Sequence, residues 1–407
     1  MELALFADRR RLGALAVVGG LYFCTGVGLD LLMALLPDLA AAFAVSSAGL
    51  VWVITARAST RIVSPVLGRL SDGLGRKAIL LPCLVAFGLG NLGSAAAPSL
   101  GWLIAAQAMA GVGLTGLQVL VPAYLGDLFP YNVRGRAIGL VAIFVGVGTM
   151  LGVPAGAYLA QAAGVRAAFL ALGGVALALA VPALFFLVSP APPARPAEAP
   201  PERPAAWHSL LQRGSVRAVL VVTWCWMLMI AACFNFLAAW LKQSLALTTG
   251  QVGLAFAMMG AAGIAASLLV ASFSDRLGKR RLMLAGLLLG TASLLPLGLI
   301  GSGWPVLAAV AFFVLANELG LGAYAVLITE LVPAQRGMVF SLHMAAWGLG
   351  VTLAPLLGSL LWQAGGFPTL SLTVSLLGVA AFVVALFYLD RPVASALQPA
   401  SGGIGTS

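Results

Sequence analysis

The stretch that decides the fold is Gly68-Arg-Leu-Ser-Asp72-Gly-Leu-Gly75-Arg76-Lys77, a charged interruption of an otherwise apolar sequence. A second copy, Ser274-Asp275-Arg276-Leu-Gly278-Lys279-Arg280, follows 203 positions later, because 275 − 72 = 203. The separation recurs downstream, where Asp127 and Glu330 are also 203 positions apart, 330 − 127 = 203. A repeat of this length predicts a chain built from two similar halves.

The composition excludes a soluble domain. Hydrophobic residues make up 61% of the 407 residues, charged residues 8%, and the mean hydropathy is +1.06, so a soluble chain would expose too much apolar surface. About twelve apolar runs are long enough to cross ~30 Å of hydrocarbon. Because a backbone in lipid must satisfy its own hydrogen bonds, each run is predicted to be a helix. The expected spans are 13–36, 48–68, 78–97, 101–125, 136–160, 167–188, 218–241, 251–272, 282–300, 304–327, 337–362 and 369–389.

The basic residues indicate the orientation in the membrane. With the N-terminus in the cytoplasm, the outside loops hold only Arg166 and Lys242, and the other basic residues outside the spans lie inside. This asymmetry is typical of the positive-inside rule and predicts that both termini are cytoplasmic. It also explains the formal charge of +10 without nucleic acid as a partner. We expect a multi-pass protein of a bacterial-type inner (plasma) membrane.

The chain divides at a run rich in proline and alanine. We expect an N-terminal six-helix bundle over 1–188, a cytoplasmic linker over 189–217, a C-terminal six-helix bundle over 218–390 and a disordered cytoplasmic tail over 391–407. Within the linker, residues 207–213 have the pattern of a short amphipathic helix at the membrane interface. The first apolar run has no small-residue cleavage site, so it is predicted to be a retained span rather than a signal peptide.

Six plus six helices, with the Gly-x-x-x-Asp-x-x-Gly-Arg-Lys loop between helices 2 and 3, resemble the major facilitator superfamily. The resemblance implies an all-α membrane protein of 12 transmembrane helices in two pseudo-symmetric six-helix bundles. Helix 5 carries Gly148-Thr-Met-Leu-Gly152-Val-Pro154-Ala-Gly156, which is similar to the motif of the drug/metabolite:proton antiporter branch. In this sequence Val153 separates Gly152 from Pro154, whereas many antiporters have the two residues adjacent.

The charged loops are candidates for a gating latch. In the resemblance, the acid and arginine of the helix 2–3 loop hold the cytoplasmic gate shut in the outward-open state; the alternative is that these charges only cap helices and set topology. Gly73 stands where the family has a basic residue, and Ala271 where the second copy would have its first glycine. The candidate latch residues are Gly68, Asp72, Gly75, Arg76, Lys77, Asp127, Arg134, Arg136, Asp275, Arg276, Glu330 and Arg336.

Helix 5 is also a candidate contact between the halves. Gly148, Gly152 and Gly156 recur every four residues, so they lie on one helix face that another backbone can approach closely. Together with Pro154 they form the predicted interface hinge, and helix 8, with Gly260 and Gly263, is the expected partner.

Few ionisable side chains fall within the predicted spans, and each costs about 2.5–3.5 kcal/mol at mid-membrane, so each should be paired, hydrated or functional. We expect Asp30, Arg57 and Glu318 to couple transport to protons, and similar depths predict an Asp30–Arg57 ion pair. Asp30 resembles the helix-1 acid of the antiporters; a structural ion pair is the alternative. Arg61 either faces the same space or extends to the cytoplasmic surface. His343 is expected to be structural.

Polar side chains on four helices predict a cavity lining. In the resemblance, helices 1, 4, 7 and 10 line the central cavity, and Gln107 stands where the family's helix 4 carries an arginine. Isolated amides can instead join helices to one another. The candidate cavity residues are Gln107, Gln118, Trp224, Asn235, Asn317, Tyr324 and Trp347.

These features predict a secondary active transporter rather than an enzyme. No phosphate-binding loop, His/Cys cluster or nucleophile–base pair is present in the sequence, so we expect no cofactor and no metal. We favour proton-coupled efflux (antiport) of a small, partly apolar solute by alternating access. The alternatives are a proton-coupled importer, a lipid or organic-anion transporter of the same fold, or a non-transporting receptor. A monomer in the lipid bilayer is expected.

Overall fold

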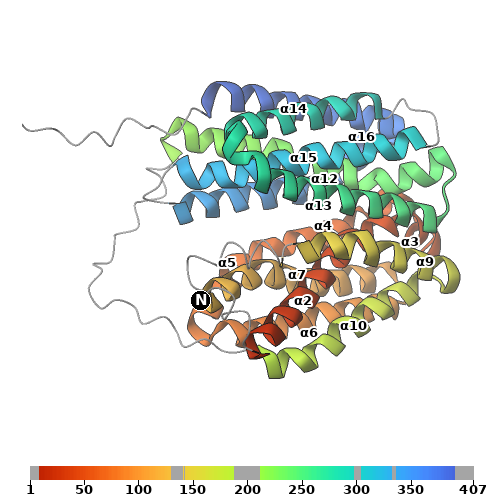
Figure 1. Ribbon diagram of the computed structural model, residues 1–407. Coiled ribbons are helices and arrows are strands. Elements are labelled where there is room, and N and C mark those ends of the chain that lie inside the picture. The colour runs from red at the N-terminus through yellow and green to blue at the C-terminus, as the bar shows by residue number, and fades with distance from the viewer. Residues whose placement is uncertain are drawn as a thin grey trace, which may run out of the picture.

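The computed structural model describes residues 9–129, 141, 143–187, 211–297, 304–331 and 336–389, and every regular element within these ranges is helical (Figure 1). The predicted tail and most of the linker, including residues 207–210, lie outside the described residues. So do Arg134 and Arg136 of the predicted latch. For Asp72, Asp275, Glu330 and Arg336, the description covers the backbone but not the side chains.

The N-half consists of α2 to α10. Its second span is interrupted, because the 3-10 turn η2 separates two short helices, and its fifth span contains a π-helical turn, η3. The elements are α2 (Arg9–Ala34), α3 (Leu36–Ala42), η1 (Ser47–Leu50), α4 (Val51–Ser59), η2 (Thr60–Val63), α5 (Ser64–Leu74), α6 (Arg76–Ala95), α7 (Leu100–Leu128), η3 (Gly148–Gly152), α9 (Val153–Ala163) and α10 (Val165–Phe186).

The C-half consists of α12 to α16. The elements are α12 (Gly214–Leu245), α13 (Thr249–Leu277), α14 (Lys279–Leu297), α15 (Trp304–Leu331) and α16 (Arg336–Tyr388). The long α16 contains two spans, because its backbone leaves helical geometry at Gly365 and Gly366, where a kink joins them.

Ten helices in the described ranges are long and apolar enough to cross a membrane. This count is compatible with the twelve predicted spans for two structural reasons. The second span is split by η2, so neither piece reaches the required length, and α16 is counted once although it crosses twice.

The repeat seen in the sequence has a backbone counterpart. Gly75 ends α5 with φ +96°, and Gly278 lies between α13 and α14 with φ +84°. Both are in the left-handed region that favours glycine, and they are 203 positions apart, 278 − 75 = 203. The charged loops of the two halves therefore make the same turn.

The two halves lie side by side, with the N-half in red to yellow-green and the C-half in green to blue (Figure 1). They meet where α13 packs against η3 and α9, and where α16 packs against α4. We call the face where α2 begins and α10 ends the terminal face, and the opposite face, which carries α3, the distal face. This arrangement leaves the middle of several helices facing the space between the halves.

Candidate transport site

Asp30 of α2 is held by a threonine that the sequence analysis did not select. Thr149, in the π-helical turn η3, donates a hydrogen bond from Oγ1 to Asp30 Oδ2 at 2.7 Å. A π-turn widens the helix by one residue and changes the direction of its side chains. The only signal in the sequence was the hydroxyl between Gly148 and Met150, one position inside the glycine motif.

The glycines of helix 5 allow this contact, but not in the way we expected. A Cβ on Gly156 would lie 2.7 Å from Leu31 Cδ1, and a Cβ on Gly148 would lie 3.1 Å from the Val27 nitrogen. Gly152 likewise faces Val27. The three glycines therefore pack against α2 of their own half, and the prediction that they contact helix 8 was wrong.

A different set of residues on helix 5 contacts the C-half. A Cβ on Gly260 of α13 would lie 2.6 Å from the Met150 nitrogen and 2.9 Å from the Gly146 carbonyl. One on Gly253 would lie 3.0 Å from Pro154 Cα, so Pro154 does lie at the contact between the halves. Helix 5 thus touches α2 with one face and α13 with another.

Arg57 is bound by glutamine rather than by Asp30. Its Nη1 donates to Gln107 Oε1 at 3.3 Å, and Gln107 Nε2 donates to Ser94 Oγ at 2.9 Å. Among the described residues no ion pair joins Arg57 to Asp30, so the predicted direct pair is not formed. Arg57 is still near enough to interact electrostatically with Asp30.

Glu318 faces the space between the halves. A Cβ on Gly263 of α13 would lie 4.0 Å from Glu318 Cγ, and the glutamate is exposed and interacts electrostatically with Asp30 of the other half. No hydrogen bond or ion pair to Glu318 is found within the described part of the chain. The two acids therefore belong to opposite halves and interact across the boundary between them.

Arg61 lies in the interrupted part of helix 2. Thr60 Oγ1 donates to the Arg57 carbonyl at 2.7 Å and lies 3.3 Å from Thr115 Oγ1, which supports the 3-10 geometry of η2. Arg61 Cβ is 3.8 Å from the position that a Cβ on Gly348 of α16 would take. Arg61 therefore stands at the boundary with the C-half.

The predicted cavity residues separate into two groups. Gln107, Asn317 and Tyr324 are buried and hydrogen-bonded within their own halves, so they line no open space in this conformation. His343 is also buried, with Nδ1 2.8 Å from Thr223 Oγ1. The other residues are partly exposed or have an unpartnered buried donor: Gln118, Trp224, Asn235 and Trp347.

The halves are joined at the distal face by polar contacts that the sequence analysis missed. Lys242 of α12 donates to Asp38 Oδ1 of α3 at 2.5 Å, and Thr249 of α13 donates to the same carboxylate at 3.0 Å. Nearby, the Gly250 nitrogen donates to Gln161 Oε1 at 2.9 Å. The repeat places Lys242 one position from the equivalent of Asp38, because 242 − 203 = 39, so the two residues lie at corresponding ends of the first helix of each half.

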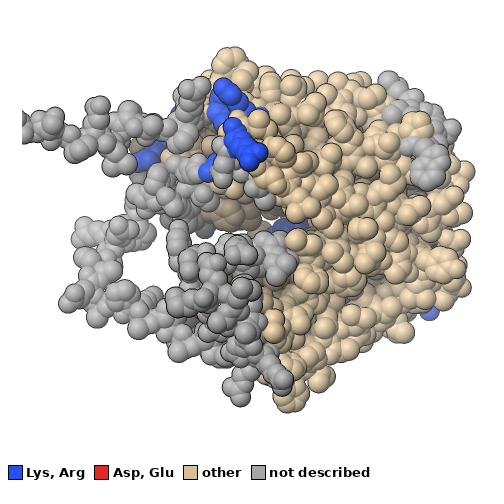
Figure 2. Space-filling model, in the orientation of Figure 1, with Lys and Arg blue, Asp and Glu red and all other residues tan. Residues whose placement is uncertain are grey.

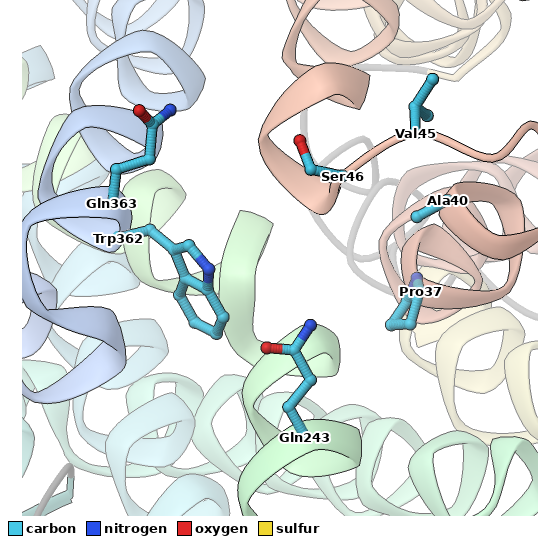
Figure 3. A pocket seen from close by; sticks show the side chains of 7 residues that line it. All are labelled: Pro37, Ala40, Val45, Ser46, Gln243, Trp362 and Gln363. Carbon is cyan, nitrogen blue, oxygen red and sulfur yellow. The ribbon is translucent and has the colours of Figure 1, made fainter.

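A cavity of about 590 Å³ lies beside this closure (Figure 3). Trp362 and Gln243 of the C-half point toward it, and Ser46 borders it from the N-half. The remaining lining residues are Pro37, Ala40, Val45 and Gln363.

The terminal face is organised differently. There Arg76 Nε contacts Asp127 Oδ2 at 2.8 Å, and both residues belong to the N-half. Lys77 donates to the Leu184 carbonyl, again within the N-half, and Arg280 donates to the Leu389 carbonyl within the C-half. The surface is hollowed between the halves on this side, and a Lys or Arg side chain is visible inside the hollow (Figure 2). As far as the described residues show, the conformation is thus closed at the distal face and open toward the terminal face.

Comparison with known proteins gives the family. The model of the Major Facilitator Superfamily matches residues 18–241 and 220–406. The uncharacterized MFS-type transporter YwfA of Bacillus subtilis is 26% identical over 379 residues, which is 92% of this chain and 91% of that protein. A multi-drug resistance efflux pump PmrA homolog of Lactococcus lactis is 24% identical and covers 89% of this chain and 90% of its own length.

Solved structures share the fold. A bacterial homolog of the human lysosomal transporter Spinster, in an inward-facing and unoccupied conformation, aligns with a TM-score of 0.74 at 15% identity, over 94% of this chain and 97% of that one. The human organic anion transporter MFSD10 aligns with a TM-score of 0.69 at 19% identity, over 93% and 100%. These matches confirm the predicted helical membrane fold of two repeated halves. The chain belongs to the Major Facilitator Superfamily and is a transporter rather than an enzyme.

Proposed function

We propose that this protein is a proton-coupled secondary transporter in which Asp30 and Glu318 bind the coupling proton. The observation that carries the proposal is the position of these two acids. Thr149 of η3, where the N-half contacts α13, holds Asp30, and Glu318 is exposed beside Gly263 of α13 and interacts electrostatically with Asp30. Two like charges in a low-dielectric space repel each other, and binding a proton removes the repulsion. Protonation at this place therefore changes how strongly the two halves attract or repel each other.

Alternating access supplies the second step. If the terminal face is cytoplasmic, as the distribution of basic residues predicts, the present conformation is inward-open, and Asp38 and Lys242 form the closed outer gate. Movement of the C-half against helix 5, along the contact of Gly260 with Met150, would open the distal face. In that outward-open state we propose that the charged loops, including Arg76 and Asp127, hold the terminal face closed.

The solute could move against the protons (exchange) or together with them (cotransport), and different observations support each mode. Efflux by exchange with protons is the mode that the helix 5 motif predicts, and it is supported by similarity to the PmrA efflux pump homolog. Cotransport with protons is the second candidate. It is supported by Arg61, which lies at the boundary between the halves and has no counterion in the described part of the chain. It is also supported by similarity to the Arabinose-proton symporter of Escherichia coli, which is 32% identical over 33% of this chain.

A reconstitution experiment tests proton coupling in either mode. The purified monomer in a bilayer of bacterial-type lipids would be given an imposed pH gradient, and tracer flux would be screened over a solute panel. We expect Asp30→Asn and Glu318→Gln to abolish the response of flux to the gradient. Glu198→Gln, in the predicted linker, is the matched control and should behave as wild type. Gradient-driven flux that survives in the double variant would refute the role of the two acids.

A further inference from the structure

The guanidinium of Arg61 has no counterion among the residues that the structure describes. No carboxylate or hydrogen-bond acceptor contacts it in the described part of the chain. Arg57, one helical turn away, carries the same charge and interacts with it electrostatically. Arg57 in turn has Gln107 as its hydrogen-bond partner. The N-half thus presents two positive charges in its interior, and within the described ranges only Arg57 has a polar side chain as its partner.

The guanidinium of Arg61 cannot extend to the terminal face of the protein. The 11 residues of α5 separate it from the terminal face, a distance of roughly 16 Å at 1.5 Å per residue. An arginine side chain cannot span that distance. An arginine also does not lose its proton in proteins, so it cannot become neutral when water leaves. When the space between the halves closes around a solute, Arg61 needs a negative charge beside it. Once Glu318 binds a proton, an anionic group on the solute supplies that charge.

We propose that the transported solute carries one anionic group, bound by Arg61, on a partly apolar body. This inference rests on the proposed function, because it requires the space between the halves to be the solute path. A planar guanidinium donates two parallel hydrogen bonds to a carboxylate, as it does to a phosphate, and a carboxylate has the single negative charge proposed here. Gly348 of α16 lies opposite Arg61, with an added Cβ 3.8 Å from Arg61 Cβ, so no side chain extends from α16 at that point.

The charges of the site then determine the coupling mode. Asp30 and Glu318 are negative and Arg57 and Arg61 positive, so the four charges sum to zero when all are ionised. The neighbouring helices also bury the titratable side chains of Tyr22, Cys24, Cys225, Cys233, Tyr324 and His343. Of these, His343 lies against Thr223 inside the C-half. A bound anion adds one negative charge in a low-dielectric space, and one proton on Asp30 or Glu318 cancels it. The anion and one proton are therefore carried together, in the same direction and without net charge.

Head-group selectivity tests the binding site. Three sets of compounds, with a phenyl, cyclohexyl or hexyl body, each contain a carboxylate, an amide and an ammonium form of the same body. We expect a carboxylate to raise the melting temperature of the purified protein while its amide and ammonium forms do not. Arg61→Gln should weaken the apparent affinity about 10- to 100-fold. Arg69→Gln, an exposed arginine on α5, should bind as wild type.

The absence of a carboxylate preference in all three sets would overturn the inference, as would a carboxylate effect that persists in Arg61→Gln. Flux of the best carboxylate tests the coupling, with protein-free and Arg61→Gln liposomes as controls for passive entry of the acid. An outside-acid gradient should accelerate uptake, and an imposed membrane potential should not. If only an amide or ammonium form shows proton-coupled flux, the solute is not an anion and this inference fails, while the proposed proton-coupled transport still holds. If no flux responds to the pH gradient, the proposed function itself fails.

Discussion

The distal gate gives the most quantitative prediction. Lys242 and Asp38 are 2.5 Å apart, their side chains are 17% and 26% exposed, and Thr249 donates to the same carboxylate. Hydrogen bonds to charged groups contribute about 1.5–3 kcal/mol, whereas exposed ion pairs contribute about 1 kcal/mol or less. Because Thr249 also donates to this carboxylate, the change removes more than one hydrogen bond to a charged group, and the larger range applies. Its loss should shift the equilibrium between inward-open and outward-open states about 10- to 100-fold.

Distances between spin labels can measure this shift. The native cysteines, Cys24, Cys83, Cys225 and Cys233, are all buried and should not react with the label. A distal pair at Ala42 and Thr248 reports on the outer gate, and a terminal pair at Leu74 and Leu277 reports on the opposite face. All four of these positions are exposed.

In Asp38→Asn and Lys242→Met we expect the distal distance to lengthen and the terminal distance to shorten. Lys242→Arg keeps the charge and should retain the wild-type distribution. Exchange of the two residues, Asp38→Lys with Lys242→Asp, should restore it in part. Distance distributions that are the same in wild type, Asp38→Asn and Lys242→Met would refute the reasoning that this pair holds the distal face closed.

Three further predictions concern single contacts. Thr149→Val removes the hydrogen bond to Asp30 and should reduce proton-driven flux about tenfold at an unchanged melting temperature. Thr149→Ser keeps the hydroxyl and should retain the flux. Equal flux in the Val and Ser variants would contradict the positioning role of the hydroxyl. Gly260→Val overlaps the helix 5 backbone and should abolish transport and cost about 1–3 kcal/mol of stability. Gly174→Val, at a glycine with open space around it, is the control. If transport is lost in this variant as well, the loss in Gly260→Val cannot be attributed to overlap with helix 5. Asp127→Asn breaks a partly exposed pair with Arg76, so the expected effect on the free energy of unfolding is about 1 kcal/mol or less, measured by thermal denaturation; a much larger loss would mean that this pair organises the terminal face.

The spans and the two halves could be predicted from the sequence, because each depends on a pattern that can be recognised without knowing the packing of the helices. Apolar length specifies a span, and the 203-residue separation specifies two halves. Even the shared backbone turn follows from glycine at 75 and 278, since only glycine adopts that conformation readily. None of these inferences requires knowledge of which helix contacts which.

The site was harder to predict because it depends on helix rotation. Periodicity placed Gly148, Gly152 and Gly156 on one face, but it could not tell whether that face meets α2 or α13. Similar depth placed Asp30 and Arg57 near each other, yet the π-turn brings the Thr149 hydroxyl to the acid, and Gln107 lies beside the arginine instead. A local widening of a helix has no clear signature in a single sequence.

A reversible cross-link tests whether the halves must separate at the distal face in every transport cycle. Gln161 and Gly250 are in contact across that face, with the Gly250 nitrogen 2.9 Å from Gln161 Oε1. Solute flux would be measured in liposomes for the Gln161→Cys, Gly250→Cys variant before and after oxidation, with the cross-linked fraction quantified. If separation of the halves is required, flux should stop on oxidation and return on reduction. Undiminished flux through fully cross-linked protein would contradict it.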